Sequence, residues 1–396
     1  MPSIRVVSWN LQWFPGGKPD ATSEESAQHM AAAQAVLKDL KPEILLLQEV
    51  RDWDAAQELC SVVPGLNVQV ASRFQPRAQN QIIASKYPAD SAWSEAWKSS
   101  TIDPPRGYSF AAITLPDNGF LLSYSLHLKS NLGEPARNVI QRQEAARQVL
   151  QHAQEMLKLY SRRGPSAVLI AGDMNTSLDD ARFEKEQTLR GWKSAGLRWT
   201  FEAVPFPQRI TIPADDGFPD NCFDHIFTAG LGQQTAAVKP YPGISDHNPV
   251  ILDVDLAKAE WKPKLDRAAG EALLRSAQAT PPPRASAIPS TSSISAGDDA
   301  RIRAAVGEVV TISGAVQNVG QSRTGSIFFI NFIGNHRGQF TGIVKRADYQ
   351  AVVAALGSDL KTALAGKRIE LRGTVELYND TPQIVVTSGE QVRVLD

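Results

Sequence analysis

The chain has 396 residues, 42% of them hydrophobic and 21% charged, an ordinary composition for a folded protein of two or three domains. This composition excludes a chain that is disordered throughout, a collagen-like chain and a coiled coil. Lys and Arg number 41 against 42 Asp and Glu, and the net charge of −1 argues against a strongly basic polyelectrolyte binder.

The N-terminal residues run straight into an apolar pattern at Ile4, without the basic and apolar segments of a secretory signal. We therefore expect a cytoplasmic protein, the alternative being a mature secreted or periplasmic chain whose signal has been removed. No apolar run approaches about 18 residues, so the sequence predicts neither a membrane span nor a membrane partner. Cys60 and Cys222 cannot build a disulfide framework, and we expect two unlinked thiols rather than one bridge.

Residues 1–256 alternate between strand and helix patterns. Apolar runs typical of buried strands and segments with helical periodicity follow one another at 4–9, 24–40, 44–47, 134–160 and 167–171. Two more strand patterns, 109–115 and 119–127, flank a Pro-Asp-Asn turn. The alternation predicts a layered α/β (α+β) domain with mixed sheets.

Residues 257–299 separate this region from the rest of the chain. The first part, to about Arg275, is charged and has a helix-like pattern, so we expect a helical bridge. In the 24 residues 276–299, 18 are Pro, Ser, Ala, Thr or Gly. Such a stretch has too little apolar surface to offset its ordering entropy, so it is interpreted as a linker, an ordered surface loop being the alternative.

Residues 300–396 have the pattern of a small β domain. Apolar residues alternate with polar ones from Arg368 to Tyr378, which predicts a strand with one solvated face. A second such strand is expected around Val310, and one helix over residues 347–356. About five strands and one helix in so short a segment suit a small barrel.

Polar residues capable of chemistry follow the apolar strands of the first region. They are Asn10, Glu49, His127, Asp173, Asn175, Asp224, Asp246 and His247. Open sheets bind ligands beyond the ends of their strands, so these side chains could converge in one cleft. A single polar residue at a strand end is more often a cap or turn residue, but so many acids, amides and histidines together make coincidence improbable.

The order of these motifs resembles the endonuclease/exonuclease/phosphatase superfamily, the DNase I-like fold, over residues 4–256. The matching segments are Trp9-Asn10-Leu11, Leu47-Gln48-Glu49, Ser125–Ser130, Gly172–Asn175, Phe223–Phe227 and Ser245-Asp246-His247. The resemblance implies a four-layer α/β sandwich and metal-dependent cleavage of phosphoester bonds.

The resemblance also implies a metal site. Mg²⁺, for which Mn²⁺ could substitute, prefers carboxylate and amide oxygens. Glu49 is the best candidate ligand, with Asn10 and Asp246 near it. The ion would polarise a phosphoryl oxygen and offset charge on the leaving oxygen.

His247 resembles the catalytic histidine of the family, with Asp224 as its carboxylate partner. Asp173 competes with this pair for the role of general base, and the sequence leaves the choice open. Asn175 would hold water or a phosphate oxygen, and His127 would donate to a phosphate oxygen or protonate the leaving group. The abasic-site endonuclease branch usually has tyrosine at the position of His127, which argues against a dedicated abasic-site enzyme.

Other polar residues of the first region have less certain roles. His225 alternates with Asp224 along a strand, so a structural role is favoured. Arg137 and Arg142 begin a predicted helix, where they either contact substrate phosphates or form a solvated face. Gln79 to Gln81 precede a Ser-Lys pair similar to one in the family, and we expect them near the cleft.

The last region resembles a nucleic-acid-binding OB-fold through residues 309–316, 326–332, 366–373 and 382–386. OB-folds bind single strands through basic grooves and stacked aromatic rings. Phe329, with Ile327 on its face, could provide stacking, as could Phe328 with Phe332. The alternative places these phenylalanines in the core or against the partner domain. The candidates for nucleic-acid binding are Phe329, Arg323, Arg337, Arg368 and Arg372.

The sequence thus predicts a monomeric, metal-dependent nuclease, with DNA favoured over RNA. A DNase I-like domain (1–256), a bridge and linker (257–299) and an OB-fold (300–396) would form the chain. The alternative is a phosphoesterase acting on a lipid head group or a small phosphate ester, with the OB-fold as an interaction module.

Overall fold

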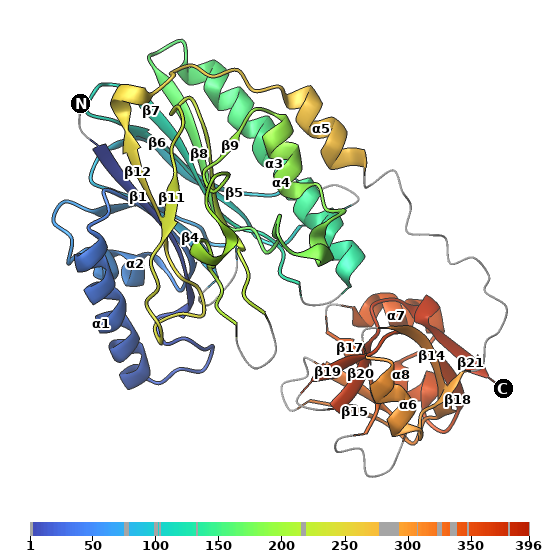
Figure 1. The fold of residues 1–396 in the computed structure, drawn as a ribbon. Helices are drawn as coiled ribbons and strands as arrows, with labels where there is room; N and C mark the ends of the chain where they lie inside the picture. Colours follow the sequence, from blue (N-terminus) through green and yellow to red (C-terminus); the bar gives the residue numbers. More distant parts are fainter. Residues whose placement is uncertain are drawn as a thin grey trace. The chain divides into compact units, whose positions relative to one another are not determined.

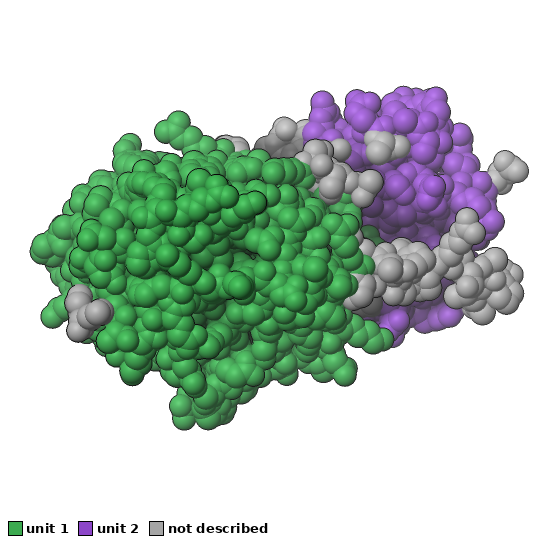
Figure 2. Space-filling view, turned by 90° about the horizontal axis from the view of Figure 1, so that it is seen from above, with its two compact units in different colours: residues 1–282 green, residues 283–396 purple. Residues whose placement is uncertain are grey.

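The computed structural model describes residues 3–74, 79–98, 102, 104–131, 134–214, 219–276, 293–306, 308–322, 327–332, 339–346, 348–378 and 381–395. The chain divides into two compact units, residues 1–282 and 283–396 (Figures 1 and 2). Arg323 and Arg337, two of the predicted nucleic-acid-binding residues, lie outside the described residues.

The first unit contains two mixed sheets of six strands. One has the order β11-β12-β1-β2-β4-β3, in which only the β1–β2 pair is parallel. Its strands are β1 (Ser3–Phe14), β2 (Ile44–Val50), β3 (Asn67–Ala71), β4 (Asn80–Ser85), β11 (Ala236–Val238) and β12 (Val250–Asp255). The apolar run at residues 44–47 is fully buried, as expected of a central strand.

The other sheet has the order β5-β6-β7-β8-β10-β9, and only β7 and β8 run parallel. Its strands are β5 (Ala89–Ala96), β6 (Gly107–Thr114), β7 (Phe120–His127), β8 (Ser166–Asp173), β9 (Arg198–Trp199) and β10 (Asp224–Ala229). Each sheet therefore has one parallel pair at its centre, whose carboxyl ends lie at the same edge.

Helices cover the outer faces of the two sheets (Figure 1). The helices α1 (Ser23–Leu40) and α2 (Trp53–Cys60) pack on the first sheet, and α3 (Pro135–Tyr160) packs on the second. Shorter elements are α4 (Thr188–Ser194) and the 3₁₀ turns Ala181–Phe183, Phe206–Gln208 and Leu256–Lys258. The first unit is thus a mixed α/β fold with the layers helix, sheet, sheet, helix.

Local sequence explains where α1 begins. Thr22 accepts from the backbone N–H of Glu25, and the Glu25 side chain accepts from the Thr22 N–H, which forms a capping box. Apolar residues at helical spacing along α1 belong to the same buried core as residues of β1, β2 and β4.

The first unit continues beyond residue 256. The helix α5 (Arg267–Ser276) contacts α3 and α4, where the helical bridge was expected. Gly270 permits the close approach of α5 to α3 and α4, because a Cβ atom on this residue would lie 2.6 Å from Leu150 and 2.9 Å from Ala195. Leu274 is fully buried in the core of the unit. Residues 257–276 therefore belong to the first unit.

The second unit contains two sheets, β13-β14-β18-β21 and β15-β16-β17-β20-β19. The strands of the first are β13 (Ile294–Ser295), β14 (Val309–Ala315), β18 (Arg368–Thr374) and β21 (Val392–Leu395). Those of the second are β15 (Asn318–Gln321), β16 (Ile327–Asn331), β17 (Thr341–Lys345), β19 (Glu376–Tyr378) and β20 (Thr381–Val385). Among the described residues of this unit, neither sheet closes into a barrel.

The described part of the unit also contains the helices α6 (Asp299–Ala304), α7 (Tyr349–Leu356) and α8 (Leu360–Leu364), with a 3₁₀ turn at Gly389–Gln391. The unit has its own apolar core, which includes Ile312, Ile330 and Leu371. No helix among the described residues is long and apolar enough to cross a membrane. Cys60 and Cys222 are both buried and unpaired.

Candidate active site

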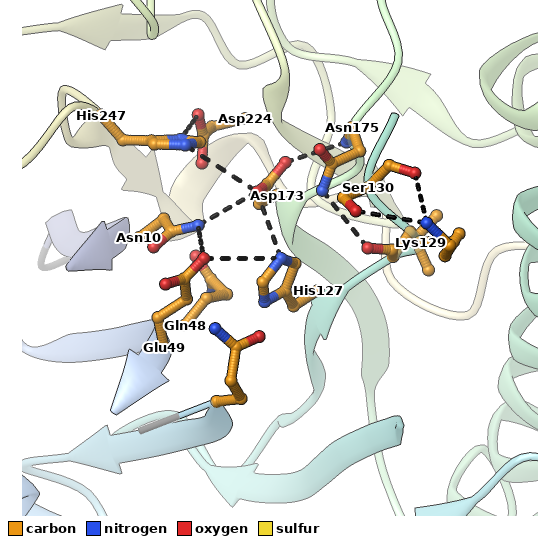
Figure 3. Close-up of polar contacts among 12 residues, drawn as sticks. Asn10, Gln48, Glu49, His127, Lys129, Ser130, Asp173, Asn175, Asp224 and His247 are labelled. Atoms are coloured by element: carbon orange, nitrogen blue, oxygen red, sulfur yellow. Dashed lines mark hydrogen bonds and ion pairs between the residues drawn. The ribbon is translucent and has the colours of Figure 1, made fainter. Parts of the chain in front are cut away.

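The two central parallel strand pairs bring the predicted residues together at one edge of the sandwich (Figure 3). In the second sheet, His127, Asp173 and Asp224 end or begin three neighbouring strands and lie in register. In the first sheet, Asn10 pairs with Gln48, directly before Glu49. The contacts below connect the residues of the two sheets.

Asp224 and His247 form the shortest contact of the site. His247 Nδ1 lies 2.7 Å from Asp224 Oδ2, and both side chains are buried. Trp9 Nε1 donates to the His247 carbonyl at 2.8 Å, and the His247 N–H donates to Ser245 Oγ at 3.0 Å. Burial lowers the pKa of His247, but the negative charges of Asp224 and Asp173 outweigh this effect and raise the pKa to about 10. The imidazole is therefore protonated at neutral pH.

Asp173 lies at the centre of the group. Its Oδ2 accepts from Asn10 Nδ2 at 3.0 Å and lies 3.5 Å from His127 Nε2 and 3.9 Å from His247 Nε2. Its Oδ1 accepts from the Asn175 N–H at 2.9 Å. Burial raises the pKa of Asp173 to about 7, against the opposing charge of His247.

Glu49 reaches the site from the first sheet, where two residues of β1 hold its carboxylate. Its Oε2 accepts from the Trp13 N–H at 3.0 Å, and its Oε1 accepts from Asn10 Nδ2 at 3.3 Å. Burial raises the pKa of Glu49 above its ordinary value. Glu49 and Asn175 have φ angles of 60° and 52°, in the left-handed region that non-glycine residues rarely adopt. Backbone strain of this kind concentrates at functional sites.

His127 is neutral, which bears on its possible roles. Burial lowers the pKa of this ring well below its ordinary value, and the positive charges of Arg106 and His247 act in the same direction. A neutral ring can donate a hydrogen bond, but it is not a source of protons at neutral pH. Of the two roles considered for His127, donation to a phosphate oxygen therefore fits better than protonation of a leaving group.

Arg106 lies behind His127 and was not predicted. Its Nη1 donates to the carbonyls of His127 and Leu128 at 3.2 and 3.1 Å, and its Nη2 donates to Gln79 Oε1 at 2.9 Å. Burial lowers its pKa, while Glu49 and Asp173 act in the opposite direction. A lone arginine before a strand gives no sequence signal, and only the fold places it near these carboxylates.

One glycine sets the spacing between β7 and β8, the strands that end at His127 and Asp173. Gly172 precedes Asp173, pairs with Leu126 and has a φ of 140°. A Cβ atom on Gly172 would lie 2.0 Å from the Leu126 carbonyl oxygen. Only glycine fits between the strand that ends at His127 and the strand that ends at Asp173.

The donor set fits a hard divalent metal ion. Glu49, Asp173 and Asp224 are carboxylates at the same edge, and Asp246, with a side chain 54% exposed, adds a fourth. Because burial raises the pKa of both Glu49 and Asp173, a cation would stabilise their charged forms. Asp173, Asp224 and His247 also present ligand atoms within 4.8 Å of one another, although Asp224 and His247 are already joined by a hydrogen bond.

Asn10 fits this site less directly. Its amide nitrogen, rather than its oxygen, faces the two carboxylates, and its oxygen accepts from the Gln12 N–H at 3.0 Å. In this arrangement Asn10 connects Glu49 and Asp173 as a donor. Binding of a metal through its oxygen would require the amide to turn over.

The first unit brings together every site residue that the sequence predicted within it. These residues are Asn10, Glu49, His127, Asp173, Asn175, Asp224, Asp246 and His247 (Figure 3 draws most of them). Asn175 also donates from Nδ2 to the Leu128 carbonyl at 3.3 Å. Ser245 connects the two sides of the site, because its hydroxyl donates to the Asn10 carbonyl at 2.8 Å.

Several neighbouring residues have structural rather than chemical roles. Arg142 is 1% exposed and forms a two-pronged ion pair with Glu186, with contacts of 2.6 and 2.8 Å, so it is unavailable for phosphate contact. Arg137 is exposed. His225 accepts from Trp199 Nε1 and contacts the Thr176 carbonyl, as expected of a structural histidine.

Gln79, directly before β4, and Gln81, within β4, differ in their contacts. Gln79 is mostly buried and holds Arg106, as described above. Gln81 is fully buried, and neither polar atom of its side chain has a hydrogen-bond partner among the described residues. Of this segment, only Gln79 is connected to His127 through Arg106.

In the second unit, the two faces of β16 differ. Phe328 and Ile330 are buried in the core, and Phe328 stacks on Tyr349 with ring centres 4.3 Å apart. Phe329 and Ile327 are half-buried on the other face. Of the two aromatic pairs considered from the sequence, Phe328 with Phe332 therefore belongs to the core. Arg368 and Arg372 are exposed on β18.

Comparison with known proteins supports the relationship suggested by the motifs. The endonuclease/exonuclease/phosphatase family matches residues 7–247. Among solved structures, an endonuclease/exonuclease/phosphatase from Beutenbergia cavernae is 19% identical, over 64% of this chain and 72% of that chain, with a TM-score of 0.50. At this identity the similarity concerns the fold.

Two other solved structures are also similar to this chain. D. rerio TDP2 complexed with a single-strand DNA product is 17% identical, over 64% of this chain and 99% of that chain, with a TM-score of 0.46. A mannosyl-6-phosphatase from Bacteroides thetaiotaomicron is 16% identical, over 64% of this chain and 100% of that chain, with a TM-score of 0.45. No curated protein sequence matches the chain significantly.

Proposed function

The chain belongs to the endonuclease/exonuclease/phosphatase family, and from this premise we propose that it is a metal-dependent hydrolase of phosphodiester bonds in nucleic acid, with DNA favoured. The observation that carries the proposal is the group formed by Asp224, His247 and Asp173, with Glu49 opposite. Two buried carboxylates beside a protonated imidazole, with the half-buried Glu49 opposite, suit a phosphate ester and a metal ion better than a neutral substrate.

We propose that Glu49 and Asp246, with Asn10, hold a divalent metal ion, Mg²⁺ being the first choice. When bound, the ion would polarise a phosphoryl oxygen and offset charge on the leaving oxygen. The strained backbone at Glu49 and the Trp13 N–H fix the position of the carboxylate, so little reorganisation is needed on binding.

The other residues act on the phosphate and the attacking water. His247, kept protonated by Asp224, would bind a non-bridging phosphate oxygen. Asp173 would orient the water and accept its proton, a role suited to a carboxyl with a pKa of about 7. His127 and the Asn175 amide would donate hydrogen bonds to the remaining phosphate oxygens.

We propose that the second unit is an OB-fold that holds the nucleic acid. Only two residues separate β14 from β15, and one separates β18 from β19. If β14 and β15 are counted as one long bent strand, and β18 and β19 as another, the unit has five strands together with β16, β17 and β20. Each of the five pairs with two of the others, which supports a partly open OB barrel. Phe329, Arg368 and Arg372 would contact the strand.

A cleavage time course with the full chain tests this proposal. The substrates are end-labelled single-stranded DNA, double-stranded DNA and RNA, together with bis(4-nitrophenyl) phosphate, each with Mg²⁺ and with EDTA. We expect metal-dependent cutting of a polymer that the His247→Ala variant loses. Hydrolysis of the small ester without cutting of any polymer would instead support the phosphoesterase alternative.

A further inference from the structure

The loop after β7 connects the active site to a buried ion pair in the interior of the first unit. Asn131 lies in this loop, four residues after His127. Its Oδ1 accepts from Arg142 Nη1 at 3.0 Å, and its Nδ2 donates to the Asn175 carbonyl at 3.0 Å. Asn131 therefore bonds a helix residue on one side and a candidate site residue on the other, although the proposed chemistry does not include it.

The helix end of this connection is fixed. Arg142 of α3 donates from Nε and Nη2 to the two carboxylate oxygens of Glu186, at 2.8 and 2.6 Å. Glu186 also accepts from the Thr188 hydroxyl at 2.6 Å, and all three side chains are buried. The two parallel bonds hold the guanidinium in one orientation. Its Nη1 donates to the loop, to the Lys129 carbonyl as well as to Asn131, each at 3.0 Å.

The site end of the connection is the turn that follows β8. Asn175 has a φ of 52°, and its N–H donates to Asp173 Oδ1 at 2.9 Å. Its side chain donates to the Leu128 carbonyl at 3.3 Å. A residue other than glycine keeps a left-handed conformation only where the surrounding structure enforces it. The bonds to its N–H, its side chain and its carbonyl enforce the conformation of Asn175, and Asn131 supplies the last of them.

An asparagine suits this place because one side chain must both accept and donate. A guanidinium has only donors and a carbonyl has only an acceptor, so the two partners also fix which way the amide faces. An aspartate would offer only acceptors, one of them to a carbonyl oxygen, and a leucine would offer neither group. The contact with Asn175 thus depends on the amide nitrogen of Asn131.

We propose that Asn131 is a positioning residue, which holds the turn at Asn175 against the buried Arg142 so that the Asn175 amide meets the phosphate. The inference rests on the proposed function, in which Asn175 donates to a phosphate oxygen. Asn131 takes no part in the reaction itself. Its effect on the rate passes through Asn175, and the ion pair of Arg142 provides the fixed point against which the turn is held.

The first measurement follows the rate. Asn131→Asp keeps the acceptor for Arg142 and replaces the donor to the Asn175 carbonyl with an oxygen. With Mg²⁺, we expect kcat for bis(4-nitrophenyl) phosphate to fall about tenfold, because a misplaced group contacts the phosphate less well. Asn131→Leu, which removes both bonds and adds no charge, should lower kcat by a similar factor. An unchanged kcat in both variants would overturn the proposal.

A double-mutant cycle distinguishes positioning from a general loss of structure. Asn175→Gly removes the amide and keeps the left-handed backbone accessible. In this background Asn131→Asp should lower kcat by less than about twofold, since the group through which Asn131 acts is gone. The same factor in both backgrounds would mean that Asn131 acts independently of Asn175, which contradicts the proposal.

Hydrogen exchange tests the position of the turn without a measurement of activity. We expect the backbone amides of residues 174–176 to exchange at least about threefold faster in Asn131→Asp than in the unaltered chain, because the turn loses one of its bonds. Unchanged exchange would contradict the positioning role. Faster exchange in a chain that hydrolyses neither DNA nor the small ester with Mg²⁺ would support this role and overturn the proposed function instead.

Asn67→Asp is the matched control. Asn67 also donates from Nδ2 to a carbonyl, that of Gly65, at 3.0 Å. It pairs with Ser85, the last residue of β4, whereas Gln79 and the site lie before the first residue of that strand. We expect this control to leave kcat and the exchange of residues 174–176 unchanged. A loss of kcat as large as that in Asn131→Asp would mean that the added charge, rather than the lost bond, lowers the rate.

Discussion

The two units of the molecule hold their candidate functional residues in opposite ways. In the first unit, Asp224, Asp173, His127 and His247 are 0, 2, 3 and 8% exposed, and each touches another member of the group. In the second unit, Arg368 and Arg372 are exposed on one strand, and Phe329 is half-buried. Burial strengthens electrostatic interactions at fixed positions, whereas exposed charges act additively and are screened by salt.

This difference in burial indicates which kind of function each unit can perform. Chemistry on a phosphate ester requires groups that are fixed before the substrate arrives, as Glu49 and Asp173 are. Retention of a polymer requires only several weak contacts along its length. Four experiments sharpen or break this comparison.

The largest expected effect follows removal of the charged imidazole. His247→Ala should lower kcat by a factor of about 10² to 10⁴, the range typical of lost acid–base or charge-stabilising groups. Arg368→Ala, in the second unit, is the matched control and should leave kcat unchanged. Steady-state kinetics on bis(4-nitrophenyl) phosphate measure both. Comparable losses in kcat for the two variants would remove the distinction between the units.

The next effect concerns the buried ion pair that supports the first unit. Arg142→Met leaves the Glu186 carboxylate buried without its cation, and we expect a loss of about 3–5 kcal/mol in the free energy of unfolding. Arg198→Met breaks an exposed pair with Glu260, where the expected loss is about 0–1 kcal/mol. Denaturant titration that follows the unfolding of the first unit measures the free energy of unfolding of both variants. Similar losses would mean that the Arg142 pair contributes no more than a surface pair.

Metal binding should stabilise one unit only. At a metal concentration about 100 times its Kd, we expect the first unit to gain about 2.7 kcal/mol. The gain should disappear in Glu49→Gln and persist in Glu260→Gln, whose side chain is exposed. Calorimetry with and without Mg²⁺ resolves the unfolding of each unit. A shift confined to the second unit, or one retained in Glu49→Gln, would place the ion elsewhere.

The smallest effect is expected from the second unit. Arg368→Ala with Arg372→Ala should make the salt dependence of single-strand binding shallower by about 1.4 in log–log slope, about 0.7 for each lost phosphate contact. Arg393→Ala removes a neighbouring arginine that is already paired with Glu370 and serves as the control. Fluorescence anisotropy at several salt concentrations measures the slope. An unchanged slope in the double variant would exclude these arginines from the binding surface.

The convergence of the candidate site residues was predictable because most of them lie at the ends of apolar strands, and strand ends are visible in sequence. Asn10, Glu49 and Asp173 each follow an apolar run, and the strand ends of the two sheets meet at one edge of the sandwich, which brings them together. The order of the strands across the sheets was not predictable, because it depends on pairings between segments more than 100 residues apart, such as β1 with β12.

Residues whose role depends on a distant partner escaped prediction. Arg142 has the periodicity of a helix face, and nothing local indicates that Glu186 will meet it in the interior. Arg106 has no motif around it. In the second unit, the alternation of apolar and polar residues predicted one strand from Arg368 to Tyr378. The sequence did not indicate that this segment forms two strands, β18 and β19.

Gly172 shows how the first unit can lose its activity without losing a functional group. A single methyl group at this position would displace the Leu126 carbonyl and spread apart the strands that carry His127 and Asp173. In a gene library randomised at codon 172, selection for activity should return glycine alone, although the residue takes no part in the chemistry. Natural drift at this position would therefore be a marker of relatives that have kept the fold and abandoned the reaction.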